Sequence, residues 1–234
     1  MSIALGFDFD HTLGLDHGLE VKAYYQLAAQ RGPALDDEDE QIAAFIADVL
    51  ARFRSDELTL DEAVGAFCTE YDVSQAESAP ERYREICYAL VEVLVTPLDG
   101  AREVLAELNE RGVRTAILTN GWSPLQHKKI AKALGYGGPV IVSDALGAAK
   151  PAGAAFDALV DVLGCARADC WYVGDNPGVD IVGAQDAGLH GVWFDWEDLR
   201  YPAGMRAPDV TIHALADIRS RVLGARAEAE KLPQ

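Results

Sequence analysis

The sequence predicts an α/β fold in which a parallel sheet is interrupted, after its first strand, by an insert made of helices. Two patterns support this fold. From residue 97 onward, short apolar runs alternate with amphipathic segments, and strands that alternate with helices pair in parallel through right-handed crossovers. Residues 18–95 instead show helical periodicity almost throughout. We therefore expect a sheet core from residues 1–14 and 97–234, and a helical domain from residues 15–96.

The chain begins with an apolar run, residues 3–7, which predicts a buried strand that stops at Asp8. The insert that follows carries apolar stripes with helical spacing, so we expect four helices there. Three of them have stripes at residues 21–28, 42–53 and 83–94. The fourth begins near residue 59, where a threonine precedes it as a capping residue.

Pro97 and Gly100 end the insert, and helices then alternate with strands. We expect the helices at residues 101–110, 124–134, 154–163 and 179–187, with a last helix from residue 215. We expect the strands at residues 114–118, 139–142, 170–173, 191–194 and 210–212. The tail after residue 226 is polar, and we expect it to fray.

The charge of the chain limits its partners. Its 234 residues include 20 Lys and Arg against 38 Asp and Glu, which gives a net charge of −18. Such an excess repels phosphate backbones and anionic lipid surfaces, so we expect neither a nucleic acid nor a membrane partner. The simplest account of the charge is solubility. Half of the residues are apolar, which suffices for a sizeable core.

The cysteines and the first residues indicate a cytoplasmic protein. Its four cysteines lie within apolar segments and lack the spacing of a zinc site, so we expect reduced thiols that pack in the interior. We see no export signal and no apolar run of membrane-spanning length.

Two carboxylates, Asp8 and Asp10, follow the first strand. The carboxyl ends of parallel strands face the crevice in which α/β proteins bind ligands, so both would lie at its mouth. Like charges about 4 Å apart cost roughly 4 kcal/mol at an effective dielectric of 20, and a hard divalent cation would offset this cost. The fragment alone is also compatible with a turn in which Thr12 caps a backbone amide.

More polar residues end other strands of the core, and these favour the metal site over the turn. Thr119 and Asn120 follow one strand, Lys150 precedes a helix, and Asp175 with Asp180 follows another strand. Carboxylates are the oxygen ligands that Mg²⁺ prefers. The Thr119 hydroxyl, the amides at a helix start and the lysine suit a phosphate group.

Four ordered segments resemble the motifs of the haloacid dehalogenase-like (HAD) hydrolase superfamily. These segments are Asp8-Phe9-Asp10-His11-Thr12, Leu118-Thr119-Asn120-Gly121, Lys150-Pro151, and Gly174-Asp175-Asn176-Pro177-Gly178-Val179-Asp180-Ile181-Val182-Gly183-Ala184. The resemblance spans residues 3–195 and implies a Rossmann-like core. The insert is similar to the mobile helical cap that some members carry between the first and second motifs.

The resemblance implies roles for individual residues. Asp8 would be the nucleophile that forms an aspartyl phosphate, and Asp10 would be the general acid and then the base. Thr119, Asn120 and Lys150 would bind the substrate's phosphoryl group.

The resemblance also implies a magnesium site. Asp175 would bind Mg²⁺ together with Asp8 and the backbone carbonyl of Asp10. Asp180 would contribute through a water or by orienting Lys150.

These residues predict a Mg²⁺-dependent phosphatase that acts on a small phosphorylated metabolite. A dehalogenase is disfavoured because Asp10 is present: an alkoxide leaving group needs a proton donor, whereas a halide does not. The open alternatives are a phosphomutase of the same superfamily and a phospho-acceptor signalling module. A signalling module is disfavoured because such receivers are shorter and lack a helical insert.

The sequence names no substrate and no oligomeric state. Candidate substrate contacts are, in the insert, His17, Lys22, Tyr25, Arg52 and Arg54, and in the core Trp122 and Gln126. For the two arginines, solvation or ion pairing is the simpler account. We expect Trp122 to line the crevice, with packing against the insert as the alternative. His11 stands where many members carry glycine; we expect it to pack at the hinge of the insert, with an approach to the leaving group as the alternative.

Overall fold

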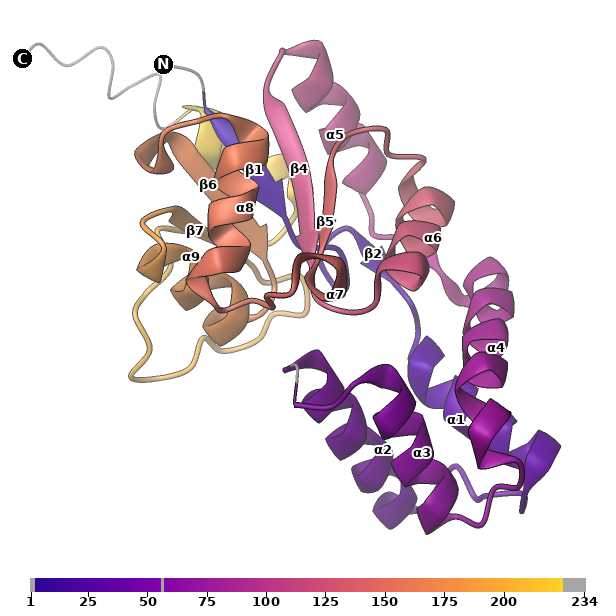
Figure 1. Cartoon of the computed structure of the whole chain (residues 1–234). Helices are drawn as coiled ribbons and strands as arrows, with labels where there is room; N and C mark the ends of the chain where they lie inside the picture. The colour runs from indigo at the N-terminus through magenta and orange to yellow at the C-terminus, as the bar shows by residue number, and fades with distance from the viewer. Residues whose placement is uncertain (1–2, 56, 225–234) are drawn as a thin grey trace, which may run out of the picture.

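The centre of the protein is a six-stranded parallel sheet with the order β5-β4-β1-β6-β7-β8 (Figure 1). The structure, a computed structural model, describes residues 3–55 and 57–224. The strands are β1 (Ala4–Phe7), β4 (Arg114–Thr119), β5 (Val140–Val142), β6 (Cys170–Gly174), β7 (His190–Phe194) and β8 (Val210–Ile212). The predicted parallel α/β fold is confirmed. The tail expected to fray after residue 226 lies outside the described residues.

Helices cover both faces of this sheet (Figure 1). They are α5 (Ala101–Glu110), α6 (Ser123–Leu134), α7 (Ser143–Leu146), α8 (Gly153–Leu163) and α9 (Gly183–Asp186). Successive side chains of a strand point to opposite faces, and β1 divides its residues accordingly. Leu5 and Phe7 belong to the larger apolar cluster, which contains residues of α5, whereas Ala4 belongs to a second cluster with residues of α8.

The helical insert leaves and re-enters the core at one place. Strands β2 (Gly14–Leu15) and β3 (Thr96–Pro97) pair antiparallel there, and the Leu98 amide donates to the Leu13 carbonyl at 3.0 Å. All four expected helices lie between them. They are α1 (Leu19–Arg31), α2 (Glu40–Arg54), α3 (Leu60–Glu70) and α4 (Ala79–Leu94).

Local signals and aromatic packing explain the insert's helices. Thr59 begins α3 with the capping box that its sequence predicts, because its hydroxyl accepts from the Glu62 amide while the Glu62 carboxylate accepts from the Thr59 amide. Tyr24 of α1 lies in the insert's interior, with ring centroids 4.7 Å from Phe67 of α3 and 4.6 Å from Tyr83 of α4. The insert therefore has an aromatic core of its own.

The structure corrects two expected elements and adds one that was not expected. The helix expected from residue 215 is two short irregular turns, Leu215–Asp217 and Arg219–Leu223. The helix expected at residues 179–187 begins as a wide turn, Pro177–Val182, before α9. Helix α7 was not expected, because its four residues are too few to show a period.

Two further findings concern the whole described chain. Within residues 3–55 and 57–224, no helix is both long and apolar enough to cross a membrane. All four cysteines are free, and three of them are buried, as their apolar surroundings predict.

Close packing of α8 on β1 gives a stability prediction. A Cβ atom at Gly6 would lie 2.5 Å from Leu159 Cδ2 and 2.8 Å from Tyr172 Cδ2. We therefore expect Gly6→Ala to lower the free energy of unfolding by about 1–3 kcal/mol, the usual cost of overpacking, in urea denaturation. The control is Gly65→Ala in α3, where the new Cβ meets open space. It should raise stability by about 0.5–1 kcal/mol, and equal effects of the two changes would contradict the packing argument.

Candidate active site

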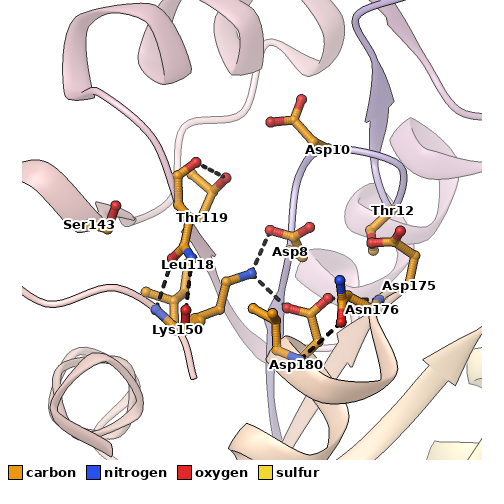
Figure 2. Close-up of polar contacts among 12 residues, drawn as sticks. Asp8, Asp10, Thr12, Leu118, Thr119, Ser143, Lys150, Asp175, Asn176 and Asp180 are labelled. Atoms are coloured by element: carbon orange, nitrogen blue, oxygen red, sulfur yellow. Dashed lines mark hydrogen bonds and ion pairs between the residues drawn. The ribbon is translucent and has the colours of Figure 1, made fainter. Parts of the chain in front are cut away.

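The ends of three neighbouring strands meet at one cavity of about 890 Å³ (Figure 2). Asp8 follows β1, Thr119 ends β4, and Asp175 follows β6, so strand order in the sheet brings them together. Lys150, in the loop before α8, and Asp180 also line this cavity. All the residues that the sequence nominates for catalysis, phosphate binding and metal binding line it: Asp8, Asp10, Thr119, Asn120, Lys150, Asp175 and Asp180.

Lys150 lies at the centre of the site with its side chain only 3% exposed. Its Nζ donates to Asp8 Oδ1 and to Asp180 Oδ1, both at 2.7 Å (Figure 2). It also donates to the Tyr172 hydroxyl at 2.8 Å. The Tyr172 hydroxyl in turn donates to the Leu118 carbonyl at 2.7 Å. An ammonium has three hydrogens, so these three acceptors fix its direction.

Asn120 fixes the main chain at Lys150. Its side-chain Nδ2 donates to the Lys150 carbonyl and its Oδ1 accepts from the Lys150 amide, both at 2.9 Å. The amide side chain of Asn120 is therefore occupied in holding the lysine's loop. Only its main chain remains for the anion binding that the sequence predicts.

Asp8, Asp175 and Asp180 form an acidic cluster in which one carboxylate oxygen of each lies within 4.8 Å of the others. Burial and repulsion by Asp180 and Asp175 raise the pKa of Asp8 to about 8, although the Lys150 ammonium opposes the rise. Burial and the Asp180 charge likewise raise the pKa of Asp175 to about 6. With all three groups ionised, the cluster would carry more negative charge than Lys150 balances, and three carboxylates suit a hard divalent cation.

The backbone at the end of β6 explains how Asp180 reaches this cluster. Asn176 caps the turn that follows, accepting from the Gly178 and Val179 amides at 3.0 Å, and its own amide donates to Asp180 Oδ2 at 3.0 Å. A Cβ at Gly174 would lie 2.5 Å from the Asp180 side chain. Glycine is therefore required at the strand end for the carboxylate to approach.

Asp10 belongs to a different set of contacts. Lys129 Nζ lies 2.5 Å from Asp10 Oδ1, and Gln126 Nε2 donates to Asp10 Oδ2 at 2.9 Å. The same Gln126 nitrogen lies 2.9 Å from Thr119 Oγ1 and 2.8 Å from the Asn120 carbonyl oxygen, so its two hydrogens are shared among three acceptors. The carboxylate of Asp10 is not part of the acidic cluster.

Sequence reasoning missed Lys129 and Tyr172. Lys129 lies on the buried side of α6 with Leu125, Gln126 and Ile130, so a lysine at an apolar position of the helical period was the available signal. Tyr172 gave no signal, since aromatic residues are ordinary in a buried strand.

The insert contributes Ala51, Arg54 and Ser55 to the cavity wall. Arg54 alone of the five insert candidates lines the cavity, and its guanidinium pairs with buried Glu20 at 2.8 Å. Arg52 forms ion pairs with Asp48 and Glu57 on the surface, and ion pairing was the simpler of the two interpretations from the sequence.

The other insert candidates make contacts outside the cavity. Lys22 Nζ donates to the His17 carbonyl at 2.8 Å, and the His17 ring lies 3.4 Å from Thr96 Oγ1. The Tyr25 side chain does not line the cavity either.

Two aromatic residues had alternative interpretations from the sequence. Trp122 does not line the cavity: it is 4% exposed and packs on Tyr88 of α4, with ring centroids 5.3 Å apart, so the alternative, packing against the insert, is confirmed. The start of α6 turns the indole toward the insert. His11 lines the cavity, which is the position that the alternative interpretation requires, and its ring stacks on that of Trp196 with centroids 6.4 Å apart.

The parallel sheet, the helical insert and the acidic cluster at strand ends together define an α/β protein with a candidate metal-dependent active site. The family model of the haloacid dehalogenase-like hydrolases matches residues 4–188. The chain therefore belongs to the haloacid dehalogenase-like hydrolase family, as its four motifs predict.

Several curated relatives are phosphatases. Phosphoserine phosphatase of Thermus thermophilus is 35% identical over 150 residues, which cover 62% of this chain and 60% of that protein. The pyrimidine 5'-nucleotidase YjjG of Escherichia coli is 29% identical, over 59% of this chain and 62% of its own length. Phosphoglycolate phosphatase of Caulobacter vibrioides is 28% identical over 68% of each chain. The chain thus spans only about six tenths of the first two relatives.

Solved structures share the fold along nearly the whole chain. The HAD-hydrolase YfnB of Bacillus subtilis, bound to magnesium, has a TM-score of 0.72 at 23% identity and covers 93% of this chain and 96% of its own. A HAD phosphatase of Thermococcus onnurineus has a TM-score of 0.67 at 24% identity, with 96% and 98% covered. These likenesses extend the shared fold to the helical insert.

The raised pKa values in the cluster predict how cation binding depends on pH. The metal-free protein keeps a proton on Asp175 up to about pH 6 and on Asp8 up to about pH 8, whereas the unfolded chain releases both near pH 4, so these groups lower stability progressively as pH rises from about 4 to 8. A bound cation displaces those protons. We expect Mg²⁺ to raise Tm more at pH 8 than at pH 6.

Calorimetric titrations in two buffers of different ionisation enthalpy should show proton release during Mg²⁺ binding. Asp175→Asn should weaken the binding, whereas Asp144→Asn, outside the acidic cluster, should not. Binding that is independent of pH and of Asp175 would contradict the assignment.

Proposed function

We propose that the protein is a Mg²⁺-dependent phosphatase that hydrolyses a small phosphomonoester through an aspartyl phosphate on Asp8. The observation that supports it best is the position of Asp8, whose carboxylate belongs to the acidic cluster and is bonded to Lys150 at 2.7 Å. Membership of a hydrolase family and relatives named as phosphatases support the same reaction.

The proposed first step transfers the phosphoryl group to Asp8. A carboxylate oxygen of Asp8 attacks phosphorus, the bond between phosphorus and the ester oxygen breaks, and Asp10 gives its proton to the departing oxygen. Lys150 holds Asp8 in place by the contact that Figure 2 draws. The Thr119 hydroxyl and the Asn120 main chain bind oxygens of the phosphoryl group.

The second step returns Asp8 to its free form. Asp10, now ionised, takes a proton from water, whose oxygen attacks phosphorus; the bond between phosphorus and the Asp8 oxygen breaks, which releases inorganic phosphate and the free Asp8 carboxylate. Asp8, Asp175 and the backbone carbonyl of Asp10 would hold Mg²⁺, and Asp180 would orient Lys150, to which it bonds at 2.7 Å. When bound, the ion would neutralise the repulsion between the phosphate and the carboxylates.

The substrate is proposed to be a small metabolite, enclosed by the insert acting as a cap. The cavity of about 890 Å³ lies in the range typical of small-molecule sites. Arg54 and Ser55 of the insert form part of its wall, so the insert can select the leaving group. A cytoplasmic location is proposed on the support of four free thiols.

The nucleophile assignment predicts that Asp8→Asn abolishes hydrolysis of 4-nitrophenyl phosphate, with a loss on the order of 10⁴-fold or more. The measurement is release of nitrophenol with and without Mg²⁺. Asp161→Asn is the control, since that carboxylate is exposed on α8 and should leave the rate unchanged. Activity of the Asp8 variant near that of the control would overturn the assignment.

Product analysis separates the alternatives. Sustained release of phosphate from sugar phosphates, nucleoside monophosphates or flavin mononucleotide would support the phosphatase. An isomeric phosphate ester would identify a phosphomutase, and a stable stoichiometric phosphoprotein would identify a phospho-acceptor module.

A further inference from the structure

A lysine is buried between the core and the attachment of the insert. Lys129 of α6 has a side chain that is 1% exposed, and its Nζ lies 2.5 Å from Asp10 Oδ1 and 2.9 Å from Asp16 Oδ2. It also lies over the ring of Phe9, 5.7 Å from the centroid. A buried ammonium is stable only when it is paired, and here both partners are carboxylates from the segment that follows β1.

Asp16 joins this lysine to the first helix of the insert. Its Oδ1 accepts from the Gly18 amide at 3.1 Å, and its carbonyl accepts from the Leu19 amide at 3.1 Å, at the point where α1 begins. His17 and Gly18 have φ of +50° and +72°, so the chain changes direction here. Any shift of α1 relative to the core therefore moves the Asp16 carboxylate that Lys129 contacts.

Asp10 is held by α6 at both carboxylate oxygens. Lys129 contacts Oδ1, and Gln126, one helical turn before it, donates to Oδ2 at 2.9 Å. Figure 2 shows this carboxylate apart from the group formed by Asp8, Lys150 and Asp180. The orientation of Asp10 thus depends on α6 and not on the acidic cluster.

We propose that Lys129 is a positioning residue that directs the Asp10 carboxylate and links its orientation, through Asp16, to the position of the insert. The inference rests on the proposed function, in which Asp10 donates a proton to the leaving oxygen. Because one ammonium contacts both carboxylates, their positions depend on each other. A displacement of Asp16 together with α1 shifts the Lys129 ammonium and so changes its ion pair with Asp10. The insert could in this way control proton donation without touching the reacting atoms.

Leaving-group dependence tests this role. Lys129→Met keeps a long apolar side chain but removes the ammonium. With Asp10 misdirected but still present, kcat/KM for a simple alkyl phosphate should fall about 10- to 100-fold, less than the full 10²- to 10⁴-fold contribution of a general acid. Nitrophenolate leaves without a proton, so kcat/KM for 4-nitrophenyl phosphate should fall less than about threefold. The parameter kcat/KM reports only the steps up to and including phosphoryl transfer, so the rate of the later hydrolysis of the aspartyl phosphate does not affect it.

Lys132→Met is the matched control. Lys132 lies on the same helix and forms an ion pair of 3.2 Å with Glu92 of α4, so its loss also removes a contact between core and insert. It touches neither Asp10 nor Asp16, and both esters should keep their wild-type rates. A selective loss on the alkyl ester in this control would assign the effect to general tethering of the insert and overturn the proposal.

A double variant tests the same role in case the single variant, which leaves a buried carboxylate unpaired, does not fold. Lys129→Met with Asp16→Asn removes one buried cation and one buried anion, and the same selective loss is expected. Equal losses on the two esters, or none, in a folded variant would overturn the role of Lys129. Wild-type protein that hydrolyses neither ester would instead contradict the proposed function.

Discussion

The burial of several carboxylates at one edge of the sheet is the constraint on which the site depends. Lys150 offsets part of this charge, and three acceptors, two carboxylates and the Tyr172 hydroxyl, fix its ammonium. The Asn120 side chain in turn bonds to the main-chain amide and carbonyl of Lys150. When all three carboxylates are ionised, one ammonium does not balance them, and this imbalance is the physical basis of the proposed cation site.

The sheet makes this arrangement possible. Three parallel strands that are neighbours in space but distant in sequence deliver Asp8, Thr119 and Asp175 to the same edge. The approach of Asp180 requires that Gly174 has no side chain. The geometry of the candidate site is thus set by strand order and by one glycine, whereas the insert supplies part of the cavity wall.

Much of this could be predicted from the sequence, since apolar runs that end in polar residues are local patterns. Asp8, Thr119 and Asp175 were found because each follows such a run, and the structure brings them to one cavity. Residues whose role depends on side-chain direction were not found. Trp122 turns toward the insert, and the partners of Lys129 lie more than a hundred residues away in the chain, which no local pattern encodes.

The insert has its entry and exit side by side, at the ribbon of β2 and β3. The Leu13 carbonyl and the Leu98 amide bond directly across this junction. For the core, this junction is equivalent to a short hairpin, whatever the length of the insert between β2 and β3. The insert can therefore be lengthened, shortened or replaced without changing the pairing of β1 with β4. Such a change alters the part of the cavity wall that the insert supplies and leaves the residues at the strand ends in place.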